Sequence, residues 1–204
     1  ESGGGVCNSY GDYEMTGGTI SSNTATSNGG GVYLDGVLTM SGGMISGNAA
    51  KNNGGGAYLY GDLIMSGGII SDNTASNNGG GVYIKEKVDR FWEPIHVKGD
   101  ARIIDNGLNN DNNVRFGSRY DGYEYCIMVD GSFTGLIGVK RELNELVAKG
   151  TRDYKLSQDD ADHFVADDLG IRLKLENGSL FYKEGYFIEE FQSKIDKAAD
   201  RSVI

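Results

Sequence analysis

The hydrophobic positions between Gly3 and Ile84 come in runs of two or three that are separated by Gly, Asn and Ser. From Gly29 on, the runs recur at a step of 25 residues, so that GGGVYLDGVLTMSGG, which begins at Gly29, returns as GGGAYLYGDLIMSGG at Gly54. The first triplet, at Gly3, precedes Gly29 by 26 residues. No run is long enough for a helix, and no 3.6-residue spacing of apolar positions persists across a copy. The repeat therefore predicts three short strands joined by tight corners, which is one turn of a parallel β-helix.

Comparison of the copies indicates which positions face the interior. One position is constant, at Ile20, Ile45 and Ile70, whereas the residue before it changes from Thr to Met to Ile. Because side chains alternate between the two faces of a strand, the constant residue points inward and the variable one outward. Stacking of coils about 4.8 Å apart then places like residues on like. The other predicted interior columns are Met15, Met40 and Met65, then Val32, Ala57 and Val82, then Leu34, Leu59 and Ile84, and finally Leu38 and Leu63.

Two columns of asparagine accompany the apolar columns. They are Asn23, Asn48 and Asn73, and Asn28, Asn53 and Asn78. Stacked amides can hydrogen-bond along the axis and satisfy backbone groups at the corners. We expect this corner role, and a ligand-binding row of amides is the alternative.

The repeat loosens after Ile84. The segment Lys85–Lys98 is charged and contains the only tryptophan, Trp92. The following GDARIIDN resembles the earlier GGIISDN at a step of 33 residues, which is 25 plus 8. We therefore expect a fourth coil with a loop of about eight residues inserted near Trp92, within 85–98.

The chain changes character after residue 122, and we expect coils over 1–122 and an α+β cap over 123–204. Apolar residues at helical spacing, including Leu143 and Leu146, predict one helix, and a capping box of Ser157 and Asp160 predicts another. Asn177-Gly178 predicts a hairpin. The expected elements are strands at Tyr125–Val129 and Leu136–Val139, helices at Lys140–Lys149, Gln158–Val165 and Tyr186–Asp200, and hairpin strands at Ile171–Glu176 and Ser179–Tyr182.

Net charge, apolar stretches and cysteine content limit which partners and sites the chain is expected to have. The 204 residues carry a net charge of −10, which disfavours nucleic acid and anionic membrane surfaces as partners. No stretch approaches the roughly 18 apolar residues of a membrane span. The chain begins inside a repeat, and we expect it to be part of a larger polypeptide. The sequence does not distinguish between a disulfide that joins Cys7 to Cys126 and two free thiols. The lack of a Cys/His cluster argues against a zinc site.

The repeat GG-x-I-S-x-N-x-A…N-G-G-G-V-Y resembles the right-handed β-helix repeats of large bacterial cell-surface proteins, common among Gram-positive gut anaerobes. It is distantly similar to the repeats of polymorphic outer-membrane proteins. The tail segments Arg102–Asn106, Gly135–Val139 and Tyr154–Asp167 resemble the end of such surface regions. The resemblance implies an all-β solenoid, a right-handed parallel β-helix of about 25 residues per coil, and an extracellular, secreted or wall-attached location. It implies no assigned reaction.

The best candidate for ligand binding is an outward column of aromatic residues, Tyr33, Tyr58 and Tyr83. Aromatic faces stack on sugars or on apolar groups of a partner. Trp92 in the inserted loop is the second candidate. The alternative is a cross-strand ladder that only stabilises the sheet.

The segment DNGLNNDNN, from Asp105 to Asn113, is rich in oxygen ligands, and Asp105 and Asp111 are the candidate ligands of a Ca²⁺ ion. It lacks the spacing of a strong calcium loop, and a polar corner is the favoured interpretation. We expect no other cofactor. Catalysis on a glycan would require clustered carboxylates, whereas Asp35 and Asp62 stand isolated in the repeats.

The sequence thus favours a non-enzymatic surface module for adhesion, display or spacing, which binds a glycan or a host or partner protein. A polysaccharide lyase or glycoside hydrolase that acts on one face of the β-helix is the alternative.

Overall fold

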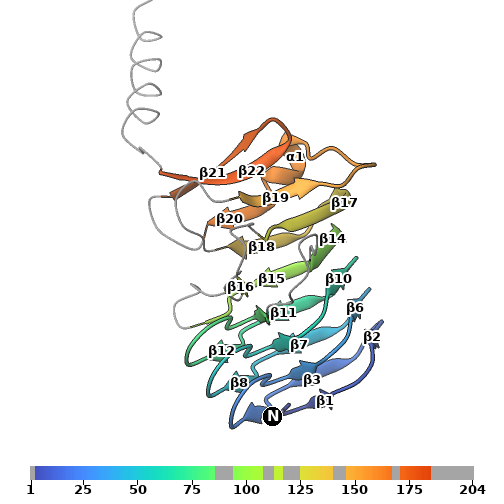
Figure 1. The fold of residues 1–204 in the computed structure, drawn as a ribbon, viewed down its shortest axis with the longest axis vertical. Helices are drawn as coiled ribbons and strands as arrows, with labels where there is room; N and C mark the ends of the chain where they lie inside the picture. The colour runs from blue at the N-terminus through green and yellow to red at the C-terminus, as the bar shows by residue number, and fades with distance from the viewer. Residues whose placement is uncertain are drawn as a thin grey trace, which may run out of the picture.

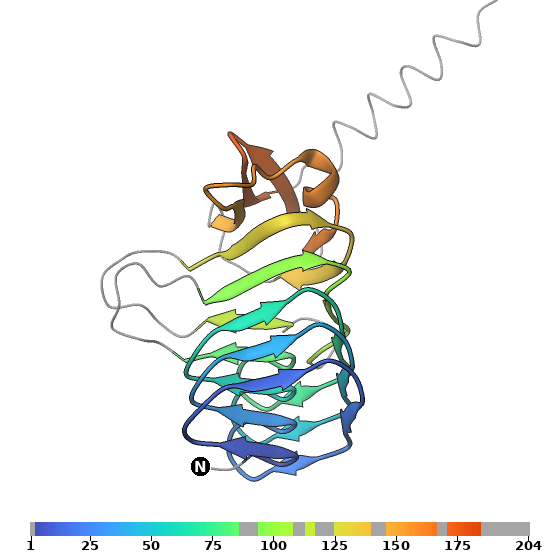
Figure 2. The same ribbon diagram turned by 90° about the vertical axis from the view of Figure 1, so that its right-hand side faces the viewer.

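The computed structural model describes residues 3–85, 94–107, 113–116, 125–139, 146–166 and 171–184. Short strands stack coil upon coil along one axis, as the views from two sides show (Figures 1 and 2). Neighbouring coils pair in parallel from the first coil to β20, and among the described strands antiparallel pairing is confined to the terminal hairpin and its neighbour. The predicted fold class, an all-β parallel β-helix solenoid, is confirmed.

Each regular coil contributes one strand to each of four sheets, which we call A to D. Sheet A contains β1 (Val6–Asn8), β5 (Val32–Leu34), β9 (Ala57–Leu59), β13 (Val82–Ile84) and β16 (Val114–Phe116). Sheet B contains β2 (Tyr13–Met15), β6 (Leu38–Met40), β10 (Leu63–Met65), β14 (Ile95–Gly99), β17 (Ile127–Phe133), β19 (Leu146–Gly150), β22 (Ser179–Glu184) and β21 (Ile171–Glu176). Sheet C contains β3 (Thr19–Ser21), β7 (Met44–Ser46), β11 (Ile69–Ser71), β15 (Arg102–Ile104), β18 (Leu136–Val139) and β20 (Phe164–Ala166). Sheet D, which was not predicted, contains the two-residue strands β4 (Thr24–Ala25), β8 (Ala49–Ala50) and β12 (Thr74–Ala75).

The core is a set of columns that run along the axis. Ile20 pairs with Ile45, Ile45 with Ile70, and Ile70 with Ile103. Ile45, Ile70 and Ile103 are completely buried, whereas the preceding Met44 is 37 % exposed. The alternation that comparison of the copies predicted is therefore confirmed. The other predicted columns also pair in register and contribute to one continuous core.

The asparagine columns are hydrogen-bonded ladders, as expected for the corners. The amide of Asn73 donates to the Asn106 side-chain oxygen and to the Ile45 carbonyl, at 2.9 Å each. Its oxygen accepts from the backbone and side-chain nitrogens of Asn48, at 3.0 and 2.9 Å. The ladder continues from Asn106 to Asn113, although the spacing along the chain is no longer 25 residues. These bonds satisfy amides that are buried in the interior of the solenoid.

The glycine triplets allow the coils to approach at the corner before sheet A. Gly54 has a φ of +66°, and a Cβ there would lie 2.4 Å from the Ala57 carbonyl oxygen. A Cβ at Gly55 would lie 2.3 Å from the Thr74 carbonyl oxygen of the next coil. A larger residue would therefore strain this corner and separate the coils.

The fourth coil resumes sheet B at Ile95, inside the range 85–98 in which the loop was expected. β14 pairs with β10 in register, with Ile95 opposite Leu63. Residues 95–98, which we had included in the loop, therefore belong to sheet B, because their alternating apolar residues continue the core columns. Residues 86–93 lie outside the described part.

The tail departs from the prediction at two helices and confirms the hairpin. Residues 146–149, which were expected to be helical, lie in β19, where Ala148 is completely buried opposite Ile127. Stacking on a parallel neighbour buries these residues and outweighs their local helical spacing. The helix α1 extends only over Gln158–Ala161, and residues 164–165 of the longer predicted helix lie in β20. The predicted capping box and the hairpin of β21 and β22 are confirmed. The expected helix Tyr186–Asp200 lies outside the described residues.

Parallel pairing continues past residue 122, because β14 pairs with β17 and β15 with β18. β17 and β18 therefore extend the stack of parallel strands beyond residue 122.

Candidate functional site

The tyrosine column forms a stacked ladder on the outer face of sheet A. Tyr33 and Tyr58 lie in register with ring centroids 5.3 Å apart and an interplanar angle of 3°, and Tyr58 and Tyr83 stack at 5.3 Å and 13°. The exposed fraction of Tyr33 is 7 % and that of Tyr58 is 5 %, whereas Tyr83 is half-buried. Neighbouring side chains therefore cover the rings of Tyr33 and Tyr58, and neither ring offers an open face to a ligand.

Tyr60, which the sequence analysis did not single out, closes one side of this ladder. Its ring meets Tyr58 edge-on at 5.5 Å and Tyr33 at 6.2 Å. Burial, and then a hydrogen bond with Tyr60, raises the pKa of the Tyr58 hydroxyl far above its usual range. Tyr60 and Tyr83 are the half-buried members that a ligand can reach. Trp92 lies outside the described residues.

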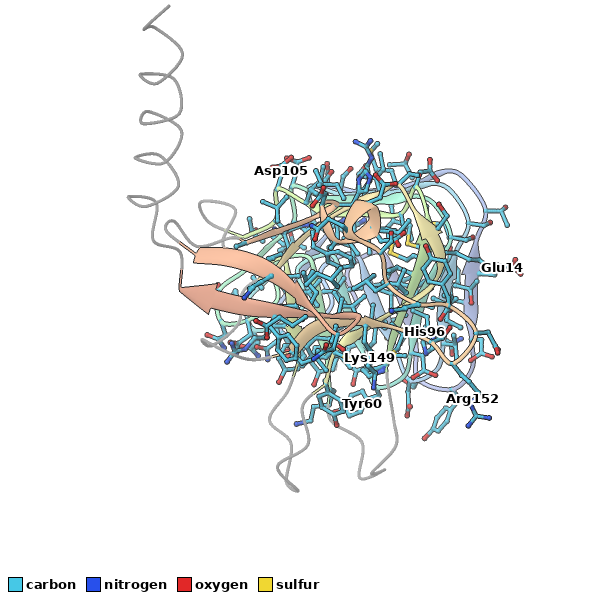
Figure 3. The ribbon with its side chains drawn as sticks, turned by 90° about the horizontal axis from the view of Figure 1, so that it is seen from above. Glu14, Tyr60, His96, Asp105, Lys149 and Arg152 are labelled. Carbon is cyan, nitrogen blue, oxygen red and sulfur yellow. The ribbon has the colours of Figure 1, made fainter. Side chains whose placement is uncertain are left out.

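Asp105 lies on a different side of the solenoid (Figure 3). Its side chain is exposed at a left-handed corner, and its backbone oxygen accepts the Asp72 amide at 3.1 Å. Asp105 borders a groove of about 250 Å³ whose floor includes Ile104, Leu136 and Val165 from three adjacent strands. Asp111, the other predicted Ca²⁺ ligand, lies outside the described part. The structure therefore shows only one of the two predicted ligands, and that one beside an apolar floor.

A second outward row, on sheet B, combines groups that the sequence analysis left separate. Ile64 pairs with His96, His96 with Met128, and Met128 with Lys149. His96 Nδ1 lies 2.9 and 3.0 Å from the two carboxylate oxygens of Asp130. Figure 3 shows His96, Lys149 and Tyr60 on the same side of the solenoid, opposite Asp105.

Two sulfur atoms meet in this row. Cys126 Sγ lies 3.9 Å from Met128 Sδ, and the two residues are 1 % and 5 % exposed. Both described cysteines are free of disulfide bonds, so the open question about Cys7 and Cys126 is decided in favour of two thiols. Cys126 directly precedes β17, and its spacing of two residues from Met128 is the signal that could have drawn attention to the pair, because extended residues two apart share a face.

A buried carboxylate organises the turn before β20. Asp160 is 2 % exposed and accepts hydrogen bonds from the Phe133 amide at 2.9 Å, the Tyr154 hydroxyl at 2.8 Å, and the Ser157 amide and hydroxyl. Burial acts to raise the pKa of Asp160, but the bonds from Ser157, Phe133 and Tyr154 outweigh it and hold the pKa below its usual range. All the described bonds are internal, so Asp160 serves the fold rather than a ligand.

Within the described ranges, no three His, Cys, Asp or Glu side chains are grouped closely enough to hold a metal ion. No helix in those ranges is long and apolar enough to cross a membrane.

Comparison with known proteins adds one finding. The model of a family described as "Periplasmic copper-binding protein (NosD)" matches residues 7–135. No curated protein and no solved structure matches the chain. The matched region spans the coils from β1 to β17 and contains both the tyrosine ladder and the sulfur pair.

Proposed function

This chain belongs to the NosD family, and we propose that it is a non-catalytic β-helix module of the bacterial cell envelope that presents its side faces to a glycan or a partner protein. The observation that carries the proposal is the continuous stack. Interior columns and an asparagine ladder run from the first coil into the irregular coils, and they hold the outward rows in fixed register. A rod of this kind is suited to extended lateral binding surfaces.

The periplasmic location in the family's description supports a place in the cell envelope. The more specific context, a secreted or wall-attached adhesin-like protein of Gram-positive type and part of a larger polypeptide, rests on the resemblance of the repeats. The net charge of −10 supports a glycan or protein partner over nucleic acid or direct contact with an anionic membrane.

We place the glycan-binding surface at the edge of the tyrosine ladder, at Tyr60 and Tyr83. The faces of Tyr33 and Tyr58 are occupied by neighbouring rings, so a sugar would meet the half-buried Tyr60 and Tyr83 first. An aromatic edge in a fixed register can stack on the apolar face of a sugar ring.

A glycan array with the full chain tests this proposal. We expect Tyr60→Ala and Tyr83→Ala to weaken binding at least tenfold, because each removes a ring that contacts the ligand. Tyr10→Ala is the control, since Tyr10 is a 90 % exposed tyrosine that is not one of the stacked rings described above. Unchanged binding by both ladder variants would overturn the placement of the site. Turnover of a pectin or alginate that one carboxylate substitution abolishes would establish the enzymatic alternative.

Copper binding, which the family's description names, is the second function that we propose for this chain. The observation that favours it is the pair of sulfur atoms of Cys126 and Met128, because thiolate and thioether are the ligands that copper in its monovalent state prefers. Binding of a copper ion by the full chain, measured by equilibrium dialysis against a metal-free control, tests this function.

A further inference from the structure

The outward column that carries the stacked tyrosines continues with a cation. β13 pairs with β16 in parallel, and Tyr83 lies directly opposite Arg115. Arg115 is exposed and Tyr83 is half-buried, so a ligand can reach both side chains from outside. Because neighbouring strands of a sheet lie about 4.8 Å apart, this column places an aromatic ring and a guanidinium side by side on the outer face of sheet A.

A second outward column lies beside the first and consists of Asp35, Tyr60 and Lys85. The backbone amides of Tyr60 and Lys85 donate to the carbonyl oxygens of Leu34 and Leu59, at 2.9 and 2.7 Å, so these residues follow one another coil by coil. The edge-on contact of the Tyr60 ring with the ladder shows that this column belongs to the same outer face. The column thus changes from acidic to aromatic to basic in the direction in which the ladder reaches its cation.

The two columns bring two cations close together at one end of the tyrosines. Lys85 follows Tyr83 by two residues, and Arg115 lies opposite Tyr83 on the next coil. Two residues span about 6.6 Å along a strand and neighbouring strands lie about 4.8 Å apart, so the Cα atoms of Lys85 and Arg115 are about 8 Å apart. Both side chains are long enough to reach one anionic group between them. Among the described residues, no carboxylate forms an ion pair with either of them.

These groups fit a sugar that carries a carboxylate. A guanidinium binds a carboxylate through two parallel hydrogen bonds, and an ammonium adds a point charge. The apolar face of a sugar ring stacks on an aromatic ring. A hexuronic acid offers both features in one residue, because its carboxylate is attached directly to the sugar ring. Asp35, which is exposed at the other end of the second column, repels a carboxylate and accepts hydrogen bonds from sugar hydroxyls, so it favours one orientation of the ligand.

We infer that Tyr60, Tyr83, Lys85 and Arg115 form a binding site for an acidic glycan. The uronate ring lies against the tyrosines, and its carboxylate pairs with Arg115 and Lys85. This inference rests on the glycan-binding surface proposed above and names the class of the glycan, the two cations and the orientation of the ligand. The chain as a whole carries a net charge of −10 and repels an acidic polymer, so binding depends on these two cations.

Calorimetric titration of the full chain with a galacturonic acid oligomer and with its methyl ester tests the site, because the ester removes the charge and keeps the ring. We expect the acid to bind at least tenfold more tightly than the ester. Arg115→Gln should weaken binding of the acid at least tenfold and leave binding of the ester unchanged. Lys85→Gln should act in the same way by a smaller factor, because an ammonium makes no bidentate pair. Tyr60→Ala and Tyr83→Ala should weaken both forms, since the ring contact is common to them.

Arg102→Gln is the matched control for the loss of charge. Arg102 is exposed like Arg115, but it lies on sheet C, opposite Ile69, and we expect its substitution to leave both affinities unchanged. Arg115→Lys keeps the charge and removes the bidentate geometry, so its affinity for the acid should lie between those of the unchanged chain and Arg115→Gln. Circular dichroism of every variant verifies the fold.

The outcomes separate the inference from the proposed function. If the unchanged chain binds no glycan on the array and neither form of the oligomer, the glycan-binding function fails and the inference fails with it. If the acid and the ester bind equally well, or if Arg115→Gln and Arg102→Gln weaken the acid equally, glycan binding stands and the acidic site is wrong. Tighter binding of dextran sulfate or of poly-glutamate than of the uronate would overturn the assignment to a uronic acid.

Discussion

The coils between Gly3 and Lys85, which we call the regular region, build the core columns from repeated residue types. The coils between Pro94 and Ala166, which we call the irregular region, continue the same columns with other residue types. In the first region each column repeats one residue type, as at Met15, Met40 and Met65. In the second region the column continues with Val97 and Val129, and the register between β14 and β17 shifts after Val97. The first region therefore relies on repetition, and the second on side chains that occur once, such as Phe133 and Asp160.

The asparagine ladder shows what the two regions share. It crosses from Asn73 to Asn106 over 33 residues and from Asn106 to Asn113 over only 7, yet the hydrogen-bond distances stay between 2.8 and 3.0 Å. Register in space is therefore independent of spacing along the chain. The columns therefore stay in register across chain segments of different length, and the length of a connecting segment adds little to the free energy of closing it.

The largest effect is expected at the centre of this ladder. Asn73→Ala removes four hydrogen bonds and leaves the Asn48 amide and the Ile45 carbonyl without their partner in a buried place. We expect the free energy of unfolding to fall by about 4 kcal/mol, from the usual cost of two buried unsatisfied groups. Denaturant titration measures it. The control Asn78→Ala, in the half-buried second ladder, is expected to cost about 1 kcal/mol. Equal losses in the two variants would contradict the central role of the first ladder.

The second largest effect is expected at Asp160, where the stability of the irregular region depends on pH in the acidic range and that of the regular region does not. Asp160→Asn places an amide against the Ser157 donors, and we expect it to reduce the stability of the region around β17 and β20 by about 2 kcal/mol at pH 7. The folded pKa of Asp160 is lowered, so its stabilisation is complete above the unfolded pKa of about 3.9 and is lost as the pH falls through the folded pKa.

Hydrogen exchange of the Phe133 amide, which donates to Asp160, measures this effect. The difference between the unchanged chain and Asp160→Asn should shrink as the pH is lowered below about 4, while Ile45 in the regular region should show no such dependence. A difference that is constant with pH would exclude the carboxylate as its source.

The sequence predicted the regular region well because repetition reveals the interior directly. A constant residue beside a variable one, as at Ile45 and Met44, is enough to assign the two faces of a strand. The irregular region offers no second copy, so local patterns decided the prediction. At Leu146–Gly150 the local pattern was helical, but stacking on β17 determined a strand. The bond between the Asn106 and Asn113 side chains continues the asparagine ladder outside the 25-residue step, and only the packing of the coils reveals it.

The candidate site was predictable only in part, for the same reason. The tyrosine ladder follows from the 25-residue step, and the register of Tyr33, Tyr58 and Tyr83 is as expected. The cover provided by Tyr60 occurs in one copy and was missed. His96 and Asp130 are 34 positions apart in the sequence, and their side chains meet only because β14 and β17 pair in parallel.

A pair of conservative changes sharpens the distinction between interior and exterior within one coil. Ile70→Val removes a methylene from a completely buried position, and we expect a loss of about 1 kcal/mol. Ile69→Val makes the same change on the outer face of the same strand, where we expect less than 0.5 kcal/mol. Thermal and denaturant unfolding measure both. Equal losses in Ile69→Val and Ile70→Val would show that Ile69 is as tightly packed as Ile70, and would contradict the assignment of Ile69 to the outer face of the strand.

The smallest effect at neutral pH is expected in the tyrosine ladder, where it grows under alkaline conditions. Tyr58→Phe keeps the stacked ring and removes only the hydroxyl that bonds with Tyr60, so we expect a loss of at most 1 kcal/mol at pH 7. The folded pKa of Tyr58 is raised by burial, so its contribution is complete below the unfolded pKa of about 10 and is lost as the pH rises above it. The unchanged chain should then lose about 1.4 kcal/mol per pH unit from this group, and Tyr58→Phe should not. Denaturant titrations at pH 7 and pH 11 should therefore reverse the order of stability of the two proteins. The same order at both values would show that the Tyr58 hydroxyl ionises freely and that the ladder is more open than its stacked rings indicate.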